Sequence, residues 1–263
     1  MTVEPNFHFD RKPVHDFAEL LHSYSGDEFD SSHRSTVPLL ALVRDKQSTL
    51  QEILAACQVP MPVDFHFEFK VDPSKGRGKP SHTDLMVISE PVCIAIEAKW
   101  TEPPYENVGS WLSKGADKTN RRGVLEGWLA LLSPHGTPLS SNEVDDCEYQ
   151  MLHRAASACA TASSYAARKR PMLAYFKFTS PNMPPSAARA EYYKAALALL
   201  HKRPLRSDFH FLLVEIQMAP TKQFGLIADL PKAGPTTGTS VRNALQETSL
   251  FNFSSFRVEQ IGR

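Results

Sequence analysis

Apolar and polar residues alternate from residue 63 to residue 70, as they do along a strand that buries one face. The apolar face of this strand is expected to carry Val63, Phe65, Phe67 and Phe69. Residues 85–88 and 93–96 are instead apolar on both faces, and a tight turn at Glu90-Pro91 separates them. This second pattern predicts a hairpin in the middle of a sheet that is covered on both sides.

Helical spacing of apolar residues predicts helices at 46–58, 123–132, 148–167 and 186–202. Residues 37–43 fit a buried helix or a buried strand, and their period does not separate the two. Two more apolar runs predict strands at 172–178 and 209–216. From residue 46 onward, the predicted order is helix, three strands, an insertion, helix, strand, helix and strand. This order is typical of a mixed α/β fold around a single sheet.

The same pattern divides the chain into three segments. Residues 1–36 are expected to form an N-terminal helical appendage, with Asp10 capping a short helix. Residues 37–219 are expected to form the α/β core, with a long insertion at 100–145. Residues 220–263 are rich in glycine, proline and threonine, and are expected to wrap loosely over the surface.

Composition narrows the function classes. The 263 residues include 29 basic and 29 acidic side chains, so the net charge is zero and any nucleic-acid binding depends on local patches. The sequence contains no C-x-x-C pair, no H-E-x-x-H, no P-loop and no G-x-S-x-G, so zinc enzymes, nucleotide hydrolases and serine hydrolases are not expected. It contains neither a secretory signal nor an apolar run of membrane-spanning length. A cytoplasmic protein without a membrane partner is therefore expected.

The predicted hairpin carries the candidate chemistry at its open end. If residues 89–92 form the loop, Ile88 lies opposite Cys93 and Asp84 lies opposite Glu97. Lys99 shares the face of Glu97, and Ala98 points to the other face. Two carboxylates and an ammonium therefore converge. A site that binds a divalent cation and activates water needs this set of groups. The structural alternative is a cross-strand ion pair at a strand end.

The predicted hairpin carries Asp84 and, after twelve intervening residues, Glu97-Ala98-Lys99. A helix and a strand come before this hairpin, and a helix and a strand come after it. The pattern resembles the PD-(D/E)xK nuclease superfamily. The resemblance covers residues 46–180 and implies a restriction-endonuclease-like core, in which helices flank a central mixed β-sheet in the order α-β-β-β-α-β. Thr83 stands where the motif's name has proline, a position at which many family members vary.

The resemblance also implies roles for individual residues. Asp84, Glu97 and the Ala98 carbonyl would hold Mg²⁺, with Mn²⁺ as a substitute, and Lys99 would orient the attacking water. Family members often place a further glutamate on the first core helix, and Glu52 is the candidate, with Glu28 and Glu68 as weaker options. Some branches place a glutamine on the helix after the motif, and Gln150 is the candidate for it here. His153 and Arg154 follow Gln150 by one helical turn and could line the same site.

Two basic segments are candidates for contacts with nucleic acid. The first leads into the hairpin and comprises Lys75, Arg77, Lys79 and His82; Gly76 and Gly78 would let its backbone approach a phosphate. The second lies in the insertion and comprises Lys114, Lys118, Arg121 and Arg122, near Trp111. The alternatives are a solvated surface loop for the first segment, and a solvated helix start beside a core tryptophan for the second.

Together these features predict a Mg²⁺-dependent nuclease that hydrolyses phosphodiester bonds in DNA. A role in restriction, defence or repair follows from the resemblance only. The alternative is a member of the same fold that binds nucleic acid or protein without cleavage. Such a protein would act as a subunit of a larger complex or as a homo-oligomer, with residues 1–36 and 220–263 as docking segments.

Overall fold

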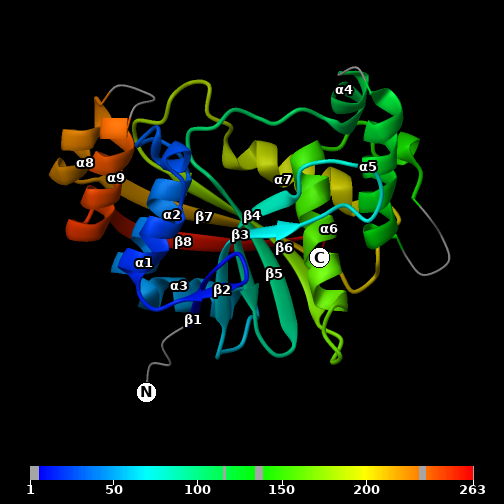
Figure 1. Ribbon diagram of the computed structural model, residues 1–263, viewed down its shortest axis with the longest axis horizontal. Coiled ribbons are helices and arrows are strands. Elements are labelled where there is room, and N and C mark those ends of the chain that lie inside the picture. Colours follow the sequence, from blue (N-terminus) through cyan, green and yellow to red (C-terminus); the bar gives the residue numbers. More distant parts are fainter. Residues whose placement is uncertain (1–5, 115–116, 134–138, 231–234, 263) are drawn as a thin grey trace.

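The computed structural model describes residues 6–114, 117–133, 139–230 and 235–262. Their strands form an eight-stranded mixed sheet in the order β2-β1-β3-β4-β5-β6-β7-β8 (Figure 1). Strands β5, β6 and β7 are parallel to one another, β3, β4 and β5 are antiparallel, and β1 is parallel to β3. The strands are β1 (Asn6–Phe9), β2 (Lys12–Val14), β3 (Asp64–Val71), β4 (Ser81–Ile88), β5 (Val92–Lys99), β6 (Arg170–Thr179), β7 (His210–Pro220) and β8 (Phe251–Ile261).

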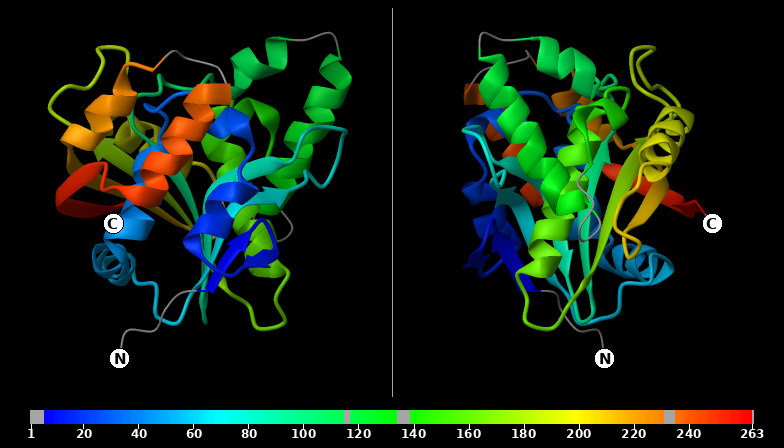
Figure 2. Two further views of the ribbon diagram at one scale, coloured as in Figure 1. Left: turned by 60° about the vertical axis from the view of Figure 1, so that its left-hand side comes forward. Right: turned by 90° about the vertical axis from the view of Figure 1, so that its right-hand side faces the viewer.

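Helices cover both faces of this sheet, and Figure 2 shows the two helical layers from two further directions. The first layer contains α1 (Phe17–Ser23), α2 (Thr36–Asp45), α3 (Gln47–Ala56), α8 (Lys222–Ala228) and α9 (Pro235–Glu247). The second contains α4 (Val108–Ser113), α5 (Lys118–Leu132), α6 (Tyr149–Ser163) and α7 (Ala190–His201). The mixed α/β fold around one sheet is therefore confirmed, and residues 37–43 belong to a helix.

The hairpin of β4 and β5 has the predicted register. Ser89 and Val92 exchange two backbone hydrogen bonds of 2.9 and 3.1 Å across the turn, and Ile88 pairs with Cys93. The two core clusters also divide the hairpin residues by face as predicted. Met86, Ile88, Cys93 and Ala95 face the α6 side, and Leu85, Val87, Ile94 and Ile96 face the α2 side. Burial on both sides explains why neither face of the hairpin needs polar residues.

Strand β3 departs from strict alternation at Glu68. Phe65 and Phe67 belong to the core cluster on the α2 side, whereas Phe69 packs into the cluster on the α6 side. Glu68 has a φ of +49°, in the left-handed region that a residue with a side chain rarely adopts. This conformation turns the chain within the strand. The prediction that Phe69 shares the face of Phe65 and Phe67 is therefore wrong.

The N-terminal segment contains strands that the sequence did not predict. Asp10 lies between β1 and β2 with a φ of +54°, and does not cap a helix. The cap of α1 is instead Asp16, whose Oδ1 accepts a hydrogen bond of 2.8 Å from the Glu19 amide. Because β1 pairs in parallel with β3, this segment is part of the sheet, and its description as a purely helical appendage is wrong.

The C-terminal segment also joins the sheet. Strand β8 pairs with β7 over its whole length, α8 packs against β7, and α9 packs against α8, α1 and α2. The register shifts by one residue near Ser254, because Gln217 pairs with Ser255 and Met218 pairs with Phe253. That irregularity breaks the apolar alternation that would reveal a strand. The prediction of a loose surface wrap is therefore wrong for residues 220–230 and 235–262, the described part of this segment.

No helix among the described residues is long and apolar enough to cross a membrane.

Candidate functional site

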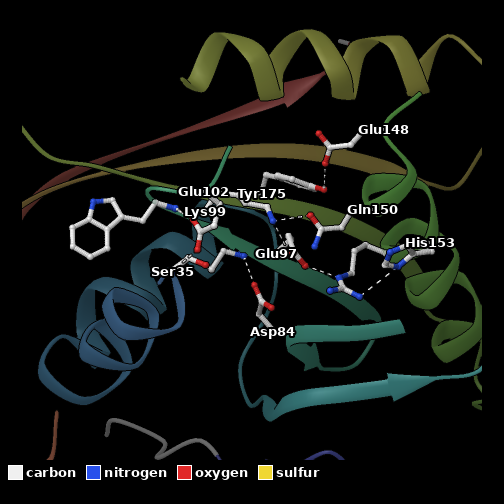
Figure 3. Close-up of polar contacts among 12 residues, drawn as sticks. Ser35, Asp84, Glu97, Lys99, Glu102, Glu148, Gln150, His153 and Tyr175 are labelled. Atoms are coloured by element: carbon white, nitrogen blue, oxygen red, sulfur yellow. Dashed lines mark hydrogen bonds and ion pairs between the residues drawn. The ribbon is translucent and has the colours of Figure 1, made fainter. Parts of the chain in front are cut away.

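Asp84, Glu97 and Lys99 meet at the end of the β4–β5 hairpin, on the face that α6 covers (Figure 3). Lys99 Nζ donates a hydrogen bond of 2.9 Å to Glu97 Oε1. Asp84 Oδ2 accepts one of 2.7 Å from the backbone amide of Ala98, just beyond the point where the β4–β5 ladder ends. The structure thus brings the three predicted residues together. Lys99 and Glu97 share a face, as predicted, and the Ala98 side chain packs into the opposite core cluster.

Helix α6 supplies the second wall of the site. Gln150 Oε1 accepts a hydrogen bond of 2.7 Å from Lys99 Nζ, so the ammonium lies between a carboxylate and an amide oxygen. One turn further along, Arg154 Nε donates to Glu97 Oε2 at 2.5 Å. Residues four apart share a helix face, which explains why Gln150 and Arg154 both reach β5. The structure therefore places Gln150 in the site, as predicted.

A buried polar chain continues from Arg154 toward the start of β4. Arg154 Nη1 donates to Ser81 Oγ at 2.7 Å, and Ser81 Oγ lies 2.8 Å from His153 Nδ1. The hydroxyl can donate to this nitrogen when the imidazole is neutral. Burial, with the nearby charges of Arg154 and Lys99, lowers the pKa of His153 well below its usual value, which keeps the ring neutral. The chain therefore fixes the Arg154 guanidinium against Glu97.

The two carboxylates have opposite electrostatic environments. Only 2% of the Glu97 surface is exposed, and this burial opposes its charge, but Arg154 and Lys99 outweigh burial and lower the pKa of Glu97. Burial and the adjacent Glu97 charge raise the pKa of Asp84 well above its usual value. Arg154 and Lys99 therefore compensate the Asp84 charge less than they compensate the Glu97 charge. A bound dication would supply that compensation.

Glu102 anchors the end of β5, which carries two members of the triad Asp84, Glu97 and Lys99. Its two oxygens accept hydrogen bonds of 2.7 Å from the backbone amides of Ser35 and Trp100 (Figure 3). Ser35 directly precedes α2, and Trp100 directly follows Lys99. This carboxylate thereby joins the first helical layer to the end of β5 and holds the Lys99 backbone in place.

A family model for a domain of unknown function (DUF6946) matches residues 12–215. The chain belongs to this family. The match begins at the first residue of β2 and ends within β7, so it includes the triad, Gln150 and Arg154. No curated protein and no solved structure matches the chain.

The predicted glutamate on the first core helix does not join the triad of this DUF6946 protein. Glu52 lies on the exposed face of α3, and among the described residues it makes no hydrogen bond or ion pair with Asp84, Glu97 or Lys99. Glu68, one of the weaker options, lies close enough to Asp84 to raise its pKa further, after burial and Glu97. Burial, then Glu68, Asp84 and Glu28, also raise the pKa of Tyr24. Glu68 and Glu28 therefore both lie near Tyr24, and Glu68 also lies near Asp84.

The loop between β3 and β4 is docked on α5. Gly76 has a φ of +75°, and a Cβ added there would lie 2.6 Å from the Val124 backbone nitrogen. A Cβ on Gly127 would lie 2.6 Å from the Lys75 nitrogen, and Arg77 N donates to Asn120 Oδ1 at 2.7 Å. Gly76 therefore serves close packing of loop and helix. The side chains of Lys75, Arg77 and Lys79 are exposed at this edge, and His82 is half-buried and lies 3.7 Å from Glu68.

The basic residues of the insertion have different surroundings. Arg121 lies over the Trp111 ring, with its guanidinium carbon 4.9 Å from the ring centroid, and donates to the Trp111 carbonyl. Trp111 also stacks on Tyr149 at a centroid distance of 3.9 Å. These contacts hold α4 and α5 against α6. Lys118 and Arg122 instead line a cavity of about 530 Å³ with Asp145.

Two buried ionisable residues near the site were not singled out by the sequence. Lys177, on β6 beside Lys99, is fully buried and donates to the Trp100 carbonyl. Burial lowers the pKa of Lys177 to about 8, and the positive charge of Lys99 contributes to the shift. Glu148 accepts hydrogen bonds from the Tyr175 and Tyr192 hydroxyls, and burial raises its pKa. The sequence does mark Lys177, because it is a charged residue within the otherwise apolar run 172–178.

Proposed function

We propose that this DUF6946 protein is a metal-dependent nuclease of the PD-(D/E)xK type, which hydrolyses phosphodiester bonds in DNA. One observation carries the proposal: Asp84 and Glu97 repel each other at the end of a buried hairpin. Lys99 lies beside them, held by Glu97 and Gln150. Repulsion between buried carboxylates destabilises the fold unless a cation or proton compensates it. An arrangement selected for stability alone would avoid it.

The donor set fits a hard divalent cation. Asp84, Glu97 and the Ala98 carbonyl offer the oxygen ligands that Mg²⁺ and Mn²⁺ prefer. The bound ion would polarise the scissile phosphate and lower the pKa of a water molecule. Lys99, held by Glu97 and Gln150, would place its ammonium beside that water and beside the negative charge that develops on the phosphate. Arg154 would keep the Glu97 carboxylate ionised and fixed.

The arrangement of elements supports the restriction-endonuclease-like core that the sequence resemblance implies. A helix precedes three consecutive antiparallel strands, and α6 then leads into β6, parallel to β5. The motif residues fall on the second and third of these strands. This element order supports such a core, with α4 and α5 inserted between β5 and α6 and with β1, β2, β7 and β8 added at the edges.

A cleavage assay tests this function. The wild-type chain is incubated with supercoiled plasmid, linear duplex and single-stranded DNA, with Mg²⁺, Mn²⁺ or EDTA. We expect cleavage of at least one substrate with either metal, none with EDTA, and a loss of at least about a hundredfold in Lys99→Ala. Lys194→Ala is the matched control, because Lys194 forms an ion pair with Glu259 on another surface. Equal cleavage by Lys99→Ala and wild type would refute the proposed mechanism.

One observation favours a second candidate, a member of this fold that binds DNA without cleaving it. Both Glu97 oxygens accept hydrogen bonds from cationic donors, Lys99 and Arg154, so this carboxylate is already neutralised. The same assay separates the two functions. DNA binding with no cleavage under any metal condition would favour the binding protein.

A further inference from the structure

A second cluster of metal-ligating side chains lies on β1 and β3, and it does not depend on the proposed nuclease activity. We propose that His8, Asp64 and His66 bind one divalent transition-metal ion, with zinc as the best match. Each residue offers one ligand atom, and these atoms all lie within 4.8 Å of one another. His8 and His66 are direct partners in the parallel β1–β3 ladder, and Asp64 lies two residues before His66 on the same strand. The ion would join β1 to β3.

His66 is already oriented as a ligand. Its Nδ1 lies 2.8 Å from the Asp10 carbonyl oxygen. Because a carbonyl can only accept, Nδ1 carries the proton, and the neutral ring keeps its lone pair on Nε2. Metal-binding histidines commonly donate their second nitrogen to a backbone carbonyl or a carboxylate in this way. The Asp10 carbonyl therefore fixes both the tautomer and the direction of the His66 ring.

His8 has a buried nitrogen that a metal ion would satisfy. Its Nδ1 is shielded from solvent and has no hydrogen-bond partner among the described residues. A buried polar atom without a partner destabilises the fold, so such atoms are rare. The His8 and His66 rings stack with centroids 4.2 Å apart and planes 16° from parallel. The two rings thus lie face to face, and each contributes one nitrogen to the cluster.

Asp64 supplies the third ligand. Its Oδ1 accepts a hydrogen bond of 2.9 Å from Asn6 Nδ2, which orients the carboxylate and leaves Oδ2 free of that contact. Zinc bonds of about 2.1 Å in tetrahedral geometry separate ligand atoms by about 3.4 Å. Separations of up to 4.8 Å must therefore shorten by at most about 1.4 Å. The last side-chain torsions of His8 and Asp64 are soft enough to allow this, while His66 keeps its hydrogen bond to Asp10.

The ligand types decide which metal is expected. Two imidazoles and one carboxylate suit zinc and its neighbours in the first transition row, whereas Mg²⁺ prefers oxygen ligands throughout. The proposed site is therefore chemically distinct from the Asp84–Glu97 site. Three protein ligands leave the fourth tetrahedral position for water.

Zinc titration of the full-length, EDTA-treated protein tests the proposal. We expect one zinc ion per chain by calorimetry, a rise in the thermal unfolding temperature, and no displacement by millimolar Mg²⁺. His8→Phe keeps the ring contact but loses a ligand, and Asp64→Asn keeps the shape but loses the charge. Each should bind zinc at least tenfold more weakly, with an unfolding temperature in EDTA no lower than that of the wild type.

Asp146→Asn, which changes a carboxylate that is 60% exposed, is the matched control and should bind zinc as the wild type does. Because the readouts are binding and unfolding, they do not depend on nuclease activity. The proposal is refuted if the wild type takes up no zinc. It is equally refuted if His8→Phe and Asp64→Asn bind zinc as tightly as the wild type.

Discussion

Arg154 and Glu97 form a buried ion pair across the interface of α6 and β5, with Nε and Oε2 separated by 2.5 Å. Exposed fractions of 6% for Arg154 and 2% for Glu97 exclude solvent from both partners. Lys99 contacts the other Glu97 oxygen at 2.9 Å. The pair therefore links the fold to the candidate site: the same contact that docks α6 on the sheet holds the Glu97 carboxylate ionised.

Removal of Arg154 should destabilise the whole fold. Arg154→Ala leaves Glu97 buried with only Lys99 as a cationic partner, and loss of one member of a buried pair costs about 3–5 kcal/mol. Urea denaturation measures the change in the free energy of unfolding. Arg203→Ala is the control, because Arg203 pairs with Asp146, which is 60% exposed, and a surface pair contributes less than about 1 kcal/mol. Equal effects of the two substitutions would contradict the assigned role of Arg154.

Docking of the β3–β4 loop on α5 should depend on Gly127. A Cβ there would lie 2.6 Å from the Lys75 backbone nitrogen, so Gly127→Ala must displace the loop and should cost about 1–3 kcal/mol of unfolding free energy. Gly225→Ala is the matched control in α8. A Cβ there meets no atom within 4 Å, so this change should be neutral or stabilising by up to about 1 kcal/mol. If Gly127→Ala were as stable as Gly225→Ala, this result would contradict close packing of the β3–β4 loop against α5 at Gly127.

His153 should make stability depend on pH. Burial, Arg154 and Lys99 lower its pKa in the folded state, whereas the unfolded chain has the ordinary value of about 6.5. Below about pH 6.5 the unfolded state therefore binds a proton that the folded state does not, and stability falls as pH falls. Above that pH both states are neutral and the effect vanishes.

Comparison with His153→Gln isolates this contribution. The stability difference between wild type and variant should change by up to about 1.4 kcal/mol per pH unit between pH 6.5 and pH 5, in the direction that disfavours the wild type at low pH. It should be constant from pH 7 to pH 8. Urea denaturation at each pH gives the values. A constant difference over the whole range would show that His153 titrates normally in the folded protein.

The hairpin could be predicted from the sequence because its information is local. Apolar residues on both faces, a proline turn and alternation of side chains set the register that places Ile88 opposite Cys93. The family resemblance supplied Gln150, and helical spacing from Gln150 then led to Arg154. In each case one element's own periodicity decides which side chains share a face.

The remaining features depend on contacts between distant segments. The positive φ of Glu68 changes the direction of Phe69 but leaves the alternation in the sequence intact. The β8 irregularity near Ser254 conceals a strand. Pairing of β1 with β3 brings His8 beside His66, and no spacing rule connects positions so far apart. The orientation of α3, which leaves Glu52 exposed, is likewise set by packing.

The most direct test of the central claim is single-turnover DNA cleavage in Mg²⁺ by Asp84→Asn, with DNA binding measured on the same samples. Asparagine keeps the shape of Asp84 but removes the charge whose repulsion by Glu97 the metal would relieve. We predict that the wild type cleaves and that Asp84→Asn is at least about a thousandfold slower, with DNA affinity unchanged. Asp208→Asn changes a carboxylate in a partly buried ion pair with Arg206 that includes none of the site residues, and should cleave normally. Cleavage by Asp84→Asn at the wild-type rate would contradict the account.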